Sequence, residues 1–294
     1  MSSLFVRTVE EDHIVALGTA PGKAAIALIR LSGANSKALA SKLFKPYSAS
    51  VLVPRSAALG RIQSESGEVV DQVLMTWFPA PESYTGEEVV EISCHGSLLI
   101  TGKIIELLVR AGARLADPGE FTRRAFLNGK LDLAQAEAVR DLIESQTMFQ
   151  ARLAAEQLGG SVSRLLEPLR ATLVDILSQM ETALEFVEDE VETENRTQQL
   201  KRLDKLNKKL LSLETGFEFG KRVREGMAVV IVGPPNAGKS SIFNALLRSD
   251  RALVTAFPGT TRDAVSEVID IEGLPVRLID TAGIRKAKDS IEEL

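Results

Sequence analysis

The amino-acid sequence predicts three successive regions of different fold class: an α+β domain over residues 1–130, an α-helical domain over 131–225, and the first part of an α/β domain over 226–294. In the first region, short β-rich runs and stretches of helical spacing are separated by Gly, Pro and Ser clusters. The second region is rich in strong helix formers, with apolar residues near a period of 3.6. The third opens with an apolar run, a glycine-rich turn and a helical pattern.

Bulk composition limits the class of protein. With 294 residues, of which 45% are hydrophobic and 26% charged, the chain is typical of a globular protein with more than one domain. The single cysteine, Cys94, excludes an internal disulfide and fits a reducing compartment. No apolar run approaches the ~18 residues of a membrane helix, and the net charge of −5 argues against a generally basic nucleic-acid binder. We therefore expect a cytoplasmic protein without a membrane partner.

Within the first region, strands are predicted where β-rich runs are bounded by turn residues. These runs are 14–17, 25–33, 71–78 and 87–96. Helical spacing predicts helices at 36–44 and 98–113, the second ending at a glycine-containing stop signal. The stretch DPGEFTRRAFLNGK, residues 117–130, is interpreted as a loop that closes the compact α+β domain.

Helices are predicted across most of the second region. The apolar residues that set the helical period are Leu133, Val139, Leu142, Ile143, Leu169, Leu173, Ile176 and Leu177. Gly159–Gly160 and Pro168 predict breaks or bends, and the acidic run EFVEDEVETEN predicts a solvated helix end or loop. The helix that resumes at residue 201 has five basic residues in its first nine, a pattern that favours a solvated face over an RNA contact.

The third region contains the strand MAVVIVG, the motif GPPNAGKS and the helix SSIFNALLRSD. The motif satisfies G-x-x-x-x-G-K-[ST] in the strand–turn–helix context of a phosphate-binding loop. Gly233 and Gly238 let successive backbone N–H groups point inward, and these donors and the helix N-terminus can hold phosphate oxygens. Lys239 would reach the outer phosphates, Ser240 would coordinate Mg²⁺, and Ser241 would lie beside the inner phosphate.

Two further strands, AVSEVIDIEG and LPVRLIDTAG, are joined by the turn Glu272–Gly273 and predict a β-hairpin. Asp280 ends the second strand, where it can hold Mg²⁺ through water, and the Gly283 N–H can contact a γ-phosphate. Thr261 precedes the hairpin, where its hydroxyl can reach Mg²⁺ only while the γ-phosphate is present. Ile284 follows the switch glycine and cannot orient an attacking water. The pattern predicts a nucleoside triphosphate switch; guanine is inferred by resemblance alone, since no Asn-Lys-x-Asp follows.

The sequences GPPNAGKSSIFNALL, PGTTRD and LIDTAGIR resemble bacterial translation-type GTPases. TAPGKAAIALIRLSG, SYTGEEVVEISCHG and DPGEFTRRAFLNGKLDLAQAEAVRDLI resemble the MnmE (TrmE) family of tRNA-modification GTPases, and these motifs span most of the chain. The resemblance implies an aminomethyltransferase-like N-terminal domain that binds folate and forms a homodimer. It also implies a helical domain with an inserted α/β P-loop GTPase (G) domain. In that family a tetrahydrofolate derivative (5-formyl or 5,10-methylene) and GTP serve carboxymethylaminomethyl addition to the tRNA wobble uridine, with MnmG, an FAD/NADH flavoprotein.

Carried over residue by residue, the resemblance implies a folate site at Arg30, Glu91 and Lys130. A carboxylate suits the amino and N–H edge of a pterin, and basic groups suit the glutamate carboxylates of folate. Read without the family, each of the three is a solvated or salt-bridged surface charge. Cys94 and His95 invite a nucleophile–base interpretation, but neighbours on a strand point to opposite faces and cannot form a dyad.

The resemblance also implies the ligands of the nucleotide site. The implied GTP-binding residues are Asn236, Ala237, Gly238, Lys239, Ser240, Ser241, Thr255, Ala256, Phe257, Pro258, Gly259, Thr260, Thr261, Asp280, Thr281, Ala282 and Gly283. The implied Mg²⁺ ligands are Ser240 and Thr261, and the implied K⁺ ligands are Asn236, Thr255, Phe257 and Thr260. A K⁺ ion can supply the charge that an arginine finger gives other GTPases. Glu292 is implied as the catalytic acid that orients water, and Lys239 as its catalytic partner at the phosphates.

The chain departs from the family pattern because the rest of the G domain and a C-terminal Cys-x-Gly-Lys motif do not follow Leu294. We interpret it as C-terminally truncated and expect weak GTP hydrolysis or none from the chain itself. The alternative function is a regulatory or ribosome-assembly-type GTPase switch whose N-terminal domain only docks a partner. Folate binding distinguishes the two functions.

Overall fold

The computed structural model of the protein describes residues 12–48, 52–185, 196–233, 237–248 and 266–280. Contacts divide the chain into two compact units, Met1–Ala136 and Glu137–Leu294. The elements of the first unit are β1 (His13–Leu17), β2 (Ala24–Ser32), α1 (Ser36–Ser41), β3 (Phe44–Pro46), β4 (Ala57–Gln63), β5 (Val69–Phe78), β6 (Val89–Gly96), α2 (Leu98–Arg110), β7 (Ala113–Leu115) and α3 (Glu120–Leu127). The domain bounds predicted at residues 130 and 225 stay predictions.

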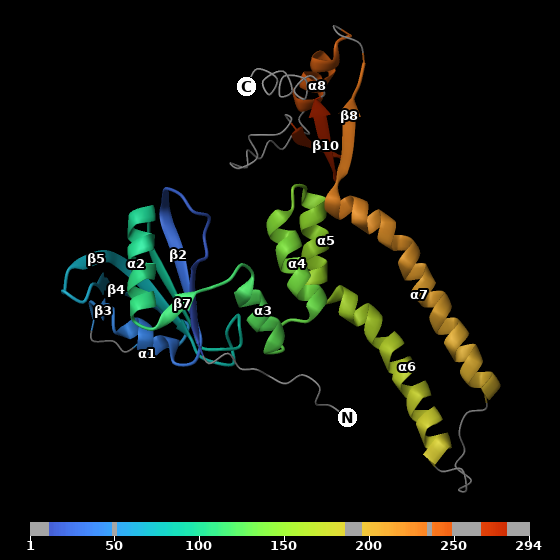
Figure 1. Cartoon of the computed structure of the whole chain (residues 1–294), viewed down its shortest axis with the longest axis horizontal. Helices are drawn as coiled ribbons and strands as arrows, with labels where there is room; N and C mark the ends of the chain where they lie inside the picture. The colour runs from blue at the N-terminus through green and yellow to red at the C-terminus, as the bar shows by residue number, and fades with distance from the viewer. Residues whose placement is uncertain (1–11, 49–51, 186–195, 234–236, 249–265, 281–294) are drawn as a thin grey trace, which may run out of the picture. The chain divides into compact units, whose positions relative to one another are not determined.

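The first unit is built on a seven-stranded sheet in the order β3-β4-β5-β6-β2-β1-β7. Neighbouring strands are antiparallel except β1 and β7, which are parallel. Helix α2 lies against this sheet (Figure 1) and buries Ile104, Leu107 and Leu108. The strands predicted within 14–17, 25–33, 71–78 and 87–96 and the helix predicted at 98–113 are confirmed, with small shifts in their ends.

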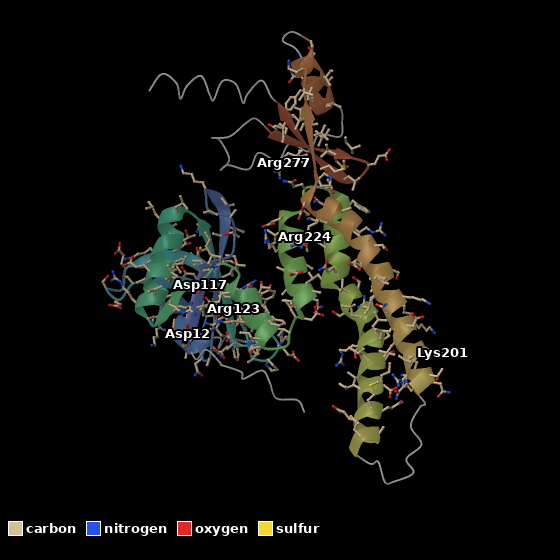
Figure 2. The ribbon with its side chains drawn as sticks, turned by 45° about the vertical axis from the view of Figure 1, so that its right-hand side comes forward. Asp12, Asp117, Arg123, Lys201, Arg224 and Arg277 are labelled. Carbon is tan, nitrogen blue, oxygen red and sulfur yellow. The ribbon has the colours of Figure 1, made fainter. Side chains whose placement is uncertain are left out.

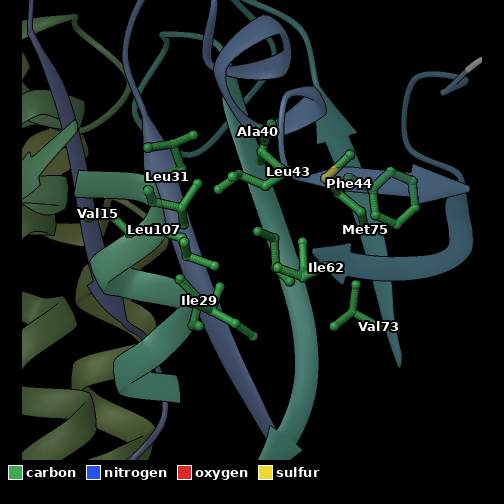
Figure 3. Close-up of a cluster of buried hydrophobic side chains, with 14 of the residues drawn as sticks. Val15, Ile29, Leu31, Ala40, Leu43, Phe44, Ile62, Val73, Met75 and Leu107 are labelled. Atoms are coloured by element: carbon green, nitrogen blue, oxygen red, sulfur yellow. The ribbon is translucent and has the colours of Figure 1, made fainter. Parts of the chain in front are cut away.

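The core of the first unit is aliphatic and fills the space between the sheet and helices α1 and α2 (Figure 3). Ile29 and Leu31 of β2 are fully buried there, as is Ile92 of β6. Because side chains alternate along a strand, Arg30 and Glu91 project from the opposite face of the sheet. The buried core and the pair of charged residues thus lie on opposite faces of the sheet.

Long helices dominate the start of the second unit. They are α4 (Leu133–Glu144), which spans the division, α5 (Met148–Leu158), α6 (Ser161–Glu185) and α7 (Arg196–Glu225). The predicted break at Gly159–Gly160 is confirmed, whereas α6 continues through Pro168. Ile176 of α6 and Leu206 of α7 are buried, and Arg202 of α7 contacts Asp175 of α6 at 2.6 Å.

A three-stranded sheet follows, in the order β8-β10-β9. Its elements are β8 (Met227–Ile231), α8 (Lys239–Arg248), β9 (Ser266–Ile271) and β10 (Leu274–Asp280). Phe243 of α8 packs on Ile269, Val276 and Leu278 of the sheet. The predicted hairpin is confirmed, and its turn residues Glu272 and Gly273 have φ of 54° and 89°, as a type I′ turn requires.

Two predictions about local structure are wrong. Residues 117–130 are not a loop throughout, because α3 occupies Glu120–Leu127; charged contacts that no sequence period reveals stabilise it. The helix predicted at 36–44 ends at Ser41, and Phe44 begins strand β3. The sequence prediction also missed the strand at Ala57–Gln63. Among the described residues, no helix is long and apolar enough to span a membrane.

Candidate functional sites

The first candidate site centres on an ion pair between two neighbouring strands. Arg30 of β2 lies directly opposite Glu91 of β6 in the antiparallel register. The Arg30 Nε and Nη2 atoms donate to Oε1 of Glu91 at 2.9 and 2.6 Å. The side chains are 27% and 23% exposed, so the pair is shielded on its flanks yet accessible from solvent. The two predicted residues are therefore brought together.

Two aromatic rings, missed in the sequence prediction, flank this ion pair. The Arg30 guanidinium lies 5.1 Å from the ring centroid of Tyr84 and 5.8 Å from that of Phe121, within cation–π range. The Tyr84 hydroxyl is 2.9 Å from Oγ1 of Thr122, which joins the β5–β6 connection to α3. Flat aromatic walls beside a planar cation suit a flat heteroaromatic ligand. The sequence offered one indication of these rings: aromatic residues form only 5% of the chain, so an aromatic residue in the same motif as a predicted site residue is a candidate for ligand contact.

Lys130 lies beside the same connection but has no described contact with Arg30. Its side chain runs over Gly86, where an added β-carbon would come within 3.1 Å of Lys130 Cγ. The neighbouring Asn128 donates from Nδ2 to the carbonyl of Thr85 at 2.8 Å. These contacts place Lys130 at the edge of the segment that supplies Tyr84. The exposed ammonium is thus available to a ligand that extends from the ion pair.

A buried network of charges fixes α3 beside the site. The side chains of Glu120 and Arg124 are 0% and 2% exposed, and they pair at 3.1 Å. Arg114 donates to Glu120 at 2.6 and 2.8 Å, and Arg124 contacts Glu87 at 3.1 Å and Asp12 at 2.6 Å. The hydrogen bond from Arg114 is the main cause that lowers the pKa of Glu120. Figure 2 labels two residues of this network, Asp12 and Arg123, which contacts Glu120 at 3.3 Å.

Cys94 and His95 occupy opposite faces of β6, as predicted. Cys94 is buried, and burial, followed by the charge of Asp71, raises the pKa of its thiol to about 11. His95 is exposed and places Nδ1 2.7 Å from Oδ1 of Asp71. The thiol and the imidazole therefore do not form a nucleophile–base dyad.

The second candidate site lies where β8 turns into α8. Gly238 has a φ of 82°, which a glycine tolerates, and its carbonyl accepts from Ile242 N at 3.0 Å as α8 begins. Lys239 is the first residue of α8, and its Nζ donates to the Gly233 carbonyl at 3.1 Å across the mouth of the turn. Ala237 directly precedes Gly238, and Ser241 lies in the first turn of α8. The N-terminus of α8 and the Lys239 ammonium thus present positive charge at one point.

The parallel pairing of β8 with β10 extends this site. Asp280, the last residue of β10, lies opposite Ile231, the last residue of β8. The carboxyl ends of both strands therefore meet at one edge, the edge from which the chain leads into Gly233. Ser240 follows at the start of α8. The order of strand, helix and second strand is the one that the sequence predicts, and the phosphate-binding and metal-binding roles of its residues stay predictions.

The other predicted nucleotide-site residues lie outside the described part of the chain. They are Asn236, Thr255, Ala256, Phe257, Pro258, Gly259, Thr260, Thr261, Thr281, Ala282, Gly283 and Glu292. Their roles in binding GTP, Mg²⁺ and K⁺ and in catalysis stay predictions.

Comparisons with known proteins address the chain as a whole. Residues 13–130 match the family described as GTP-binding protein TrmE N-terminus, and residues 133–293 match the MnmE helical domain. A protein named tRNA modification GTPase MnmE from Koribacter versatilis is 47% identical over 286 residues, 97% of this chain and 63% of the relative. Relatives of the same name from Aquifex aeolicus and Levilactobacillus brevis are 46% and 43% identical, over 96% and 98% of this chain and 63% of each relative.

The chain thus spans about 63% of the length of these curated relatives. The two matched ranges follow one another almost without a gap and cover the α+β unit, the long helices and the three-stranded sheet. The chain therefore belongs to the MnmE (TrmE) family.

Proposed function

We propose that the chain supplies the folate-binding and nucleotide-binding elements of a GTP-hydrolysing component of tRNA wobble-uridine modification. The product is a carboxymethylaminomethyl group at C5 of the uridine, with a folate one-carbon donor and an FAD/NADH flavoprotein of the MnmG type. The protein acts as a cytoplasmic homodimer formed through its N-terminal domain. Family membership, the printed names of the relatives and the two candidate sites support the proposal.

The folate half of the proposal rests on Arg30, Glu91 and the two rings beside them. Glu91 can accept hydrogen bonds from the amino and N–H edge of a pterin, and Tyr84 and Phe121 can contact its faces. Lys130, at the edge of the same segment, suits a carboxylate of the glutamate tail.

The nucleotide half rests on a single observation, the parallel pair β8–β10 that ends beside the N-terminus of α8. Backbone N–H groups there would hold phosphates, and Lys239 would contact the outer ones. Ser240 and Thr261 would hold Mg²⁺, and Asn236, Thr255, Phe257 and Thr260 would hold K⁺. Glu292 would orient the attacking water.

Calorimetric titration of 5-formyltetrahydrofolate into the chain tests the folate half. Saturable binding is expected, and Arg30→Ala and Glu91→Ala should each weaken it. Arg55→Ala is the matched control because Arg55 forms an exposed pair with Glu82 at 2.7 Å. Absence of saturable binding would instead favour the switch whose N-terminal domain only docks a partner.

Fluorescent GTP and ATP analogues test the nucleotide half. We expect saturable GTP binding in the protein extended to the full length of its relatives, and faster hydrolysis in KCl than in NaCl. Asn236→Ala should abolish the potassium preference while leaving nucleotide binding in place. Equal rates in the two salts would contradict the potassium role.

A further inference from the structure

Three segments far apart in the sequence meet at the first turn of α5. Thr147, the N-cap residue of α5, donates from Oγ1 to the carbonyl of Gly273 at 2.8 Å, and the same oxygen accepts from Gln150 N at 3.2 Å. Gln150 donates from Nε2 to the carbonyls of Val223 and Arg224 at 2.9 and 3.1 Å. One helical turn therefore binds both the β9–β10 turn and the end of α7.

These carbonyls mark the points where the chain enters two strands. Gly273 immediately precedes β10. Helix α7 ends at Glu225, and only Gly226 separates it from β8. Because Met227 lies opposite Val276 in the parallel register, the starting ends of β8 and β10 are neighbours. The first turn of α5 thus holds the starting ends of both strands that lead to the nucleotide site.

Close backbone packing supports the same junction. A β-carbon added to Gly273 would come 2.9 Å from Cβ of Phe149, and one added to Gly226 would come 2.9 Å from the Pro275 carbonyl. Arg224 donates from Nε to Asp141 of α4 at 3.0 Å, and Figure 2 shows Arg224 at the end of α7. Since both glycines also have positive φ, neither accepts a side chain without displacing a neighbour.

The chemistry of Gln150 goes beyond helix capping. Its Oε1 accepts from the backbone N–H groups of Gln146 and Thr147 at 2.8 and 3.1 Å, which completes a capping box with Thr147. A glutamate would serve that acceptor role equally well and would suit the helix dipole. The amide adds donors, and these satisfy carbonyls at the end of α7 that have no partner within their own helix. Only an amide side chain performs both tasks here.

We propose that Thr147 and Gln150 are positioning residues for the nucleotide site, acting through β8 and β10. The two strands run in parallel from the α5 junction to the edge formed by Gly233 and Asp280, about 16 Å away for five residues of strand. A strand fixed at its start has a fixed end, so loosening the junction displaces the phosphate-binding turn relative to Asp280. This inference rests on the proposed nucleotide function.

Gln150→Glu is the sharpest test because it retains the capping acceptor, removes the donors to α7 and places a carboxylate oxygen against the two carbonyls that they served. The matched control is Gln135→Glu in the capping box of α4, where Gln135 Oε1 accepts from Asp132 N at 2.9 Å and Gln135 N donates to Asp132 Oδ1 at 2.8 Å. Hydrogen exchange of the whole chain is measured by mass spectrometry. We expect exchange of residues 227–231 and 274–280 to rise about tenfold in Gln150→Glu, because both hydrogen bonds from its amide to α7 are lost, and to be unchanged in Gln135→Glu.

Thr147 provides a second, independent test, because one substitution removes its hydroxyl and another retains it. Thr147→Val removes the hydroxyl at nearly constant volume and should raise exchange of the same strands, whereas Thr147→Ser should restore the wild-type pattern. In the protein extended to the full length of its relatives, affinity for fluorescent GDP should fall several-fold in Gln150→Glu. Exchange of residues 89–110 should be unaltered. That second region separates a local effect on the strands from general unfolding.

The outcomes separate this inference from the proposed function. Equal exchange in Gln150→Glu and wild type, or an equal rise in both Glu variants, would overturn the junction. Faster strand exchange without any change in GDP affinity would overturn the positioning role while leaving GTP binding intact. A wild-type protein that binds no guanine nucleotide would refute the proposed nucleotide function, and the positioning role with it, whatever the exchange data show.

Discussion

The two candidate sites of this chain are built from different materials. The site of Arg30 and Glu91 is an assembly of side chains from β2, β6, the β5–β6 connection and α3, and its ion pair joins residues 61 apart in sequence. The described part of the site at β8 and α8 consists mainly of backbone: Gly238 with its positive φ, the start of α8, and the Gly233 carbonyl that accepts from Lys239. A site made of backbone groups can be recognised from one contiguous sequence motif, whereas a site made of side chains depends on the tertiary fold that brings them together.

The comparison predicts that the first site is more sensitive to distant changes. Glu120→Ala should lower the free energy of unfolding by about 3 kcal/mol, because it removes the carboxylate that Arg114 and the buried Arg124 share and leaves Arg124 with Glu87 and Asp12. Urea unfolding measures the effect. Glu106→Ala is the control: its pairs with Lys103 and Arg110 are exposed to solvent, so its cost should be far smaller than that of Glu120→Ala. Equal costs for the two variants would mean that burial adds nothing to the network.

Lowering the pH should reduce the contribution of Glu120 to the free energy of unfolding. Since Arg114 lowers the pKa of Glu120 in the folded chain, the stability that this carboxylate contributes is complete above its unfolded pKa of about 4.3 and is lost as pH falls below it. The gap in unfolding free energy between wild type and Glu120→Gln should therefore narrow from pH 5 toward pH 3, in urea titrations at each pH. A gap that stays constant over this range would show that the hydrogen bond is not charge-dependent.

The backbone site should depend on one side chain above all. Lys239→Ala should lower affinity for a fluorescent GTP analogue by about 10–100-fold, since a hydrogen bond to a charged group contributes about 1.5–3 kcal/mol. Lys221→Ala, at an exposed position of α7, is the control and should bind normally. Unfolding free energies of both variants should match that of wild type. A Lys239→Ala variant with wild-type affinity would refute the phosphate-contacting role.

A smaller effect is expected at the ion pair itself. Arg30→Lys keeps the charge but loses the planar fork that donates twice to Glu91, so folate affinity should fall about tenfold. Arg55→Lys makes the same exchange in an exposed pair and should leave affinity unchanged. If both variants bind folate like wild type, geometry at Arg30 does not matter and only its charge does.

The smallest effect separates the ring of Tyr84 from its hydroxyl. Tyr84→Phe keeps the ring beside Arg30 and removes the bond to Thr122, which should cost at most about 1 kcal/mol in stability. Tyr84→Leu removes the cation–π contact as well and should weaken folate binding further. Indistinguishable folate affinities for the two variants would argue against an aromatic wall.

The same contrast explains what the sequence could predict. The hairpin at Glu272–Gly273, the start of α8 at Lys239 and the long helices follow from local rules of turn chemistry and apolar period. Helix α3 could not be predicted in this way, because its stability comes from charges at Glu87 and Arg114 that the fold brings to Glu120 and Arg124. The roles of Arg30, Glu91 and Lys130 came from resemblance. Tyr84 and Phe121 stand in two of the motifs that carry the resemblance, but neither was assigned a role, because their nearness to Arg30 appears only once the fold brings the β5–β6 connection and α3 to it.

The buried position of Cys94 has a practical consequence. Only thiolates react appreciably with maleimides, and a pKa of about 11 leaves this thiol protonated at neutral pH. Because the chain contains no other cysteine, a single cysteine introduced on an exposed helix position would carry a fluorophore or spin label almost alone. This chain is thus suited to labelling at one chosen point, without prior removal of its own thiol.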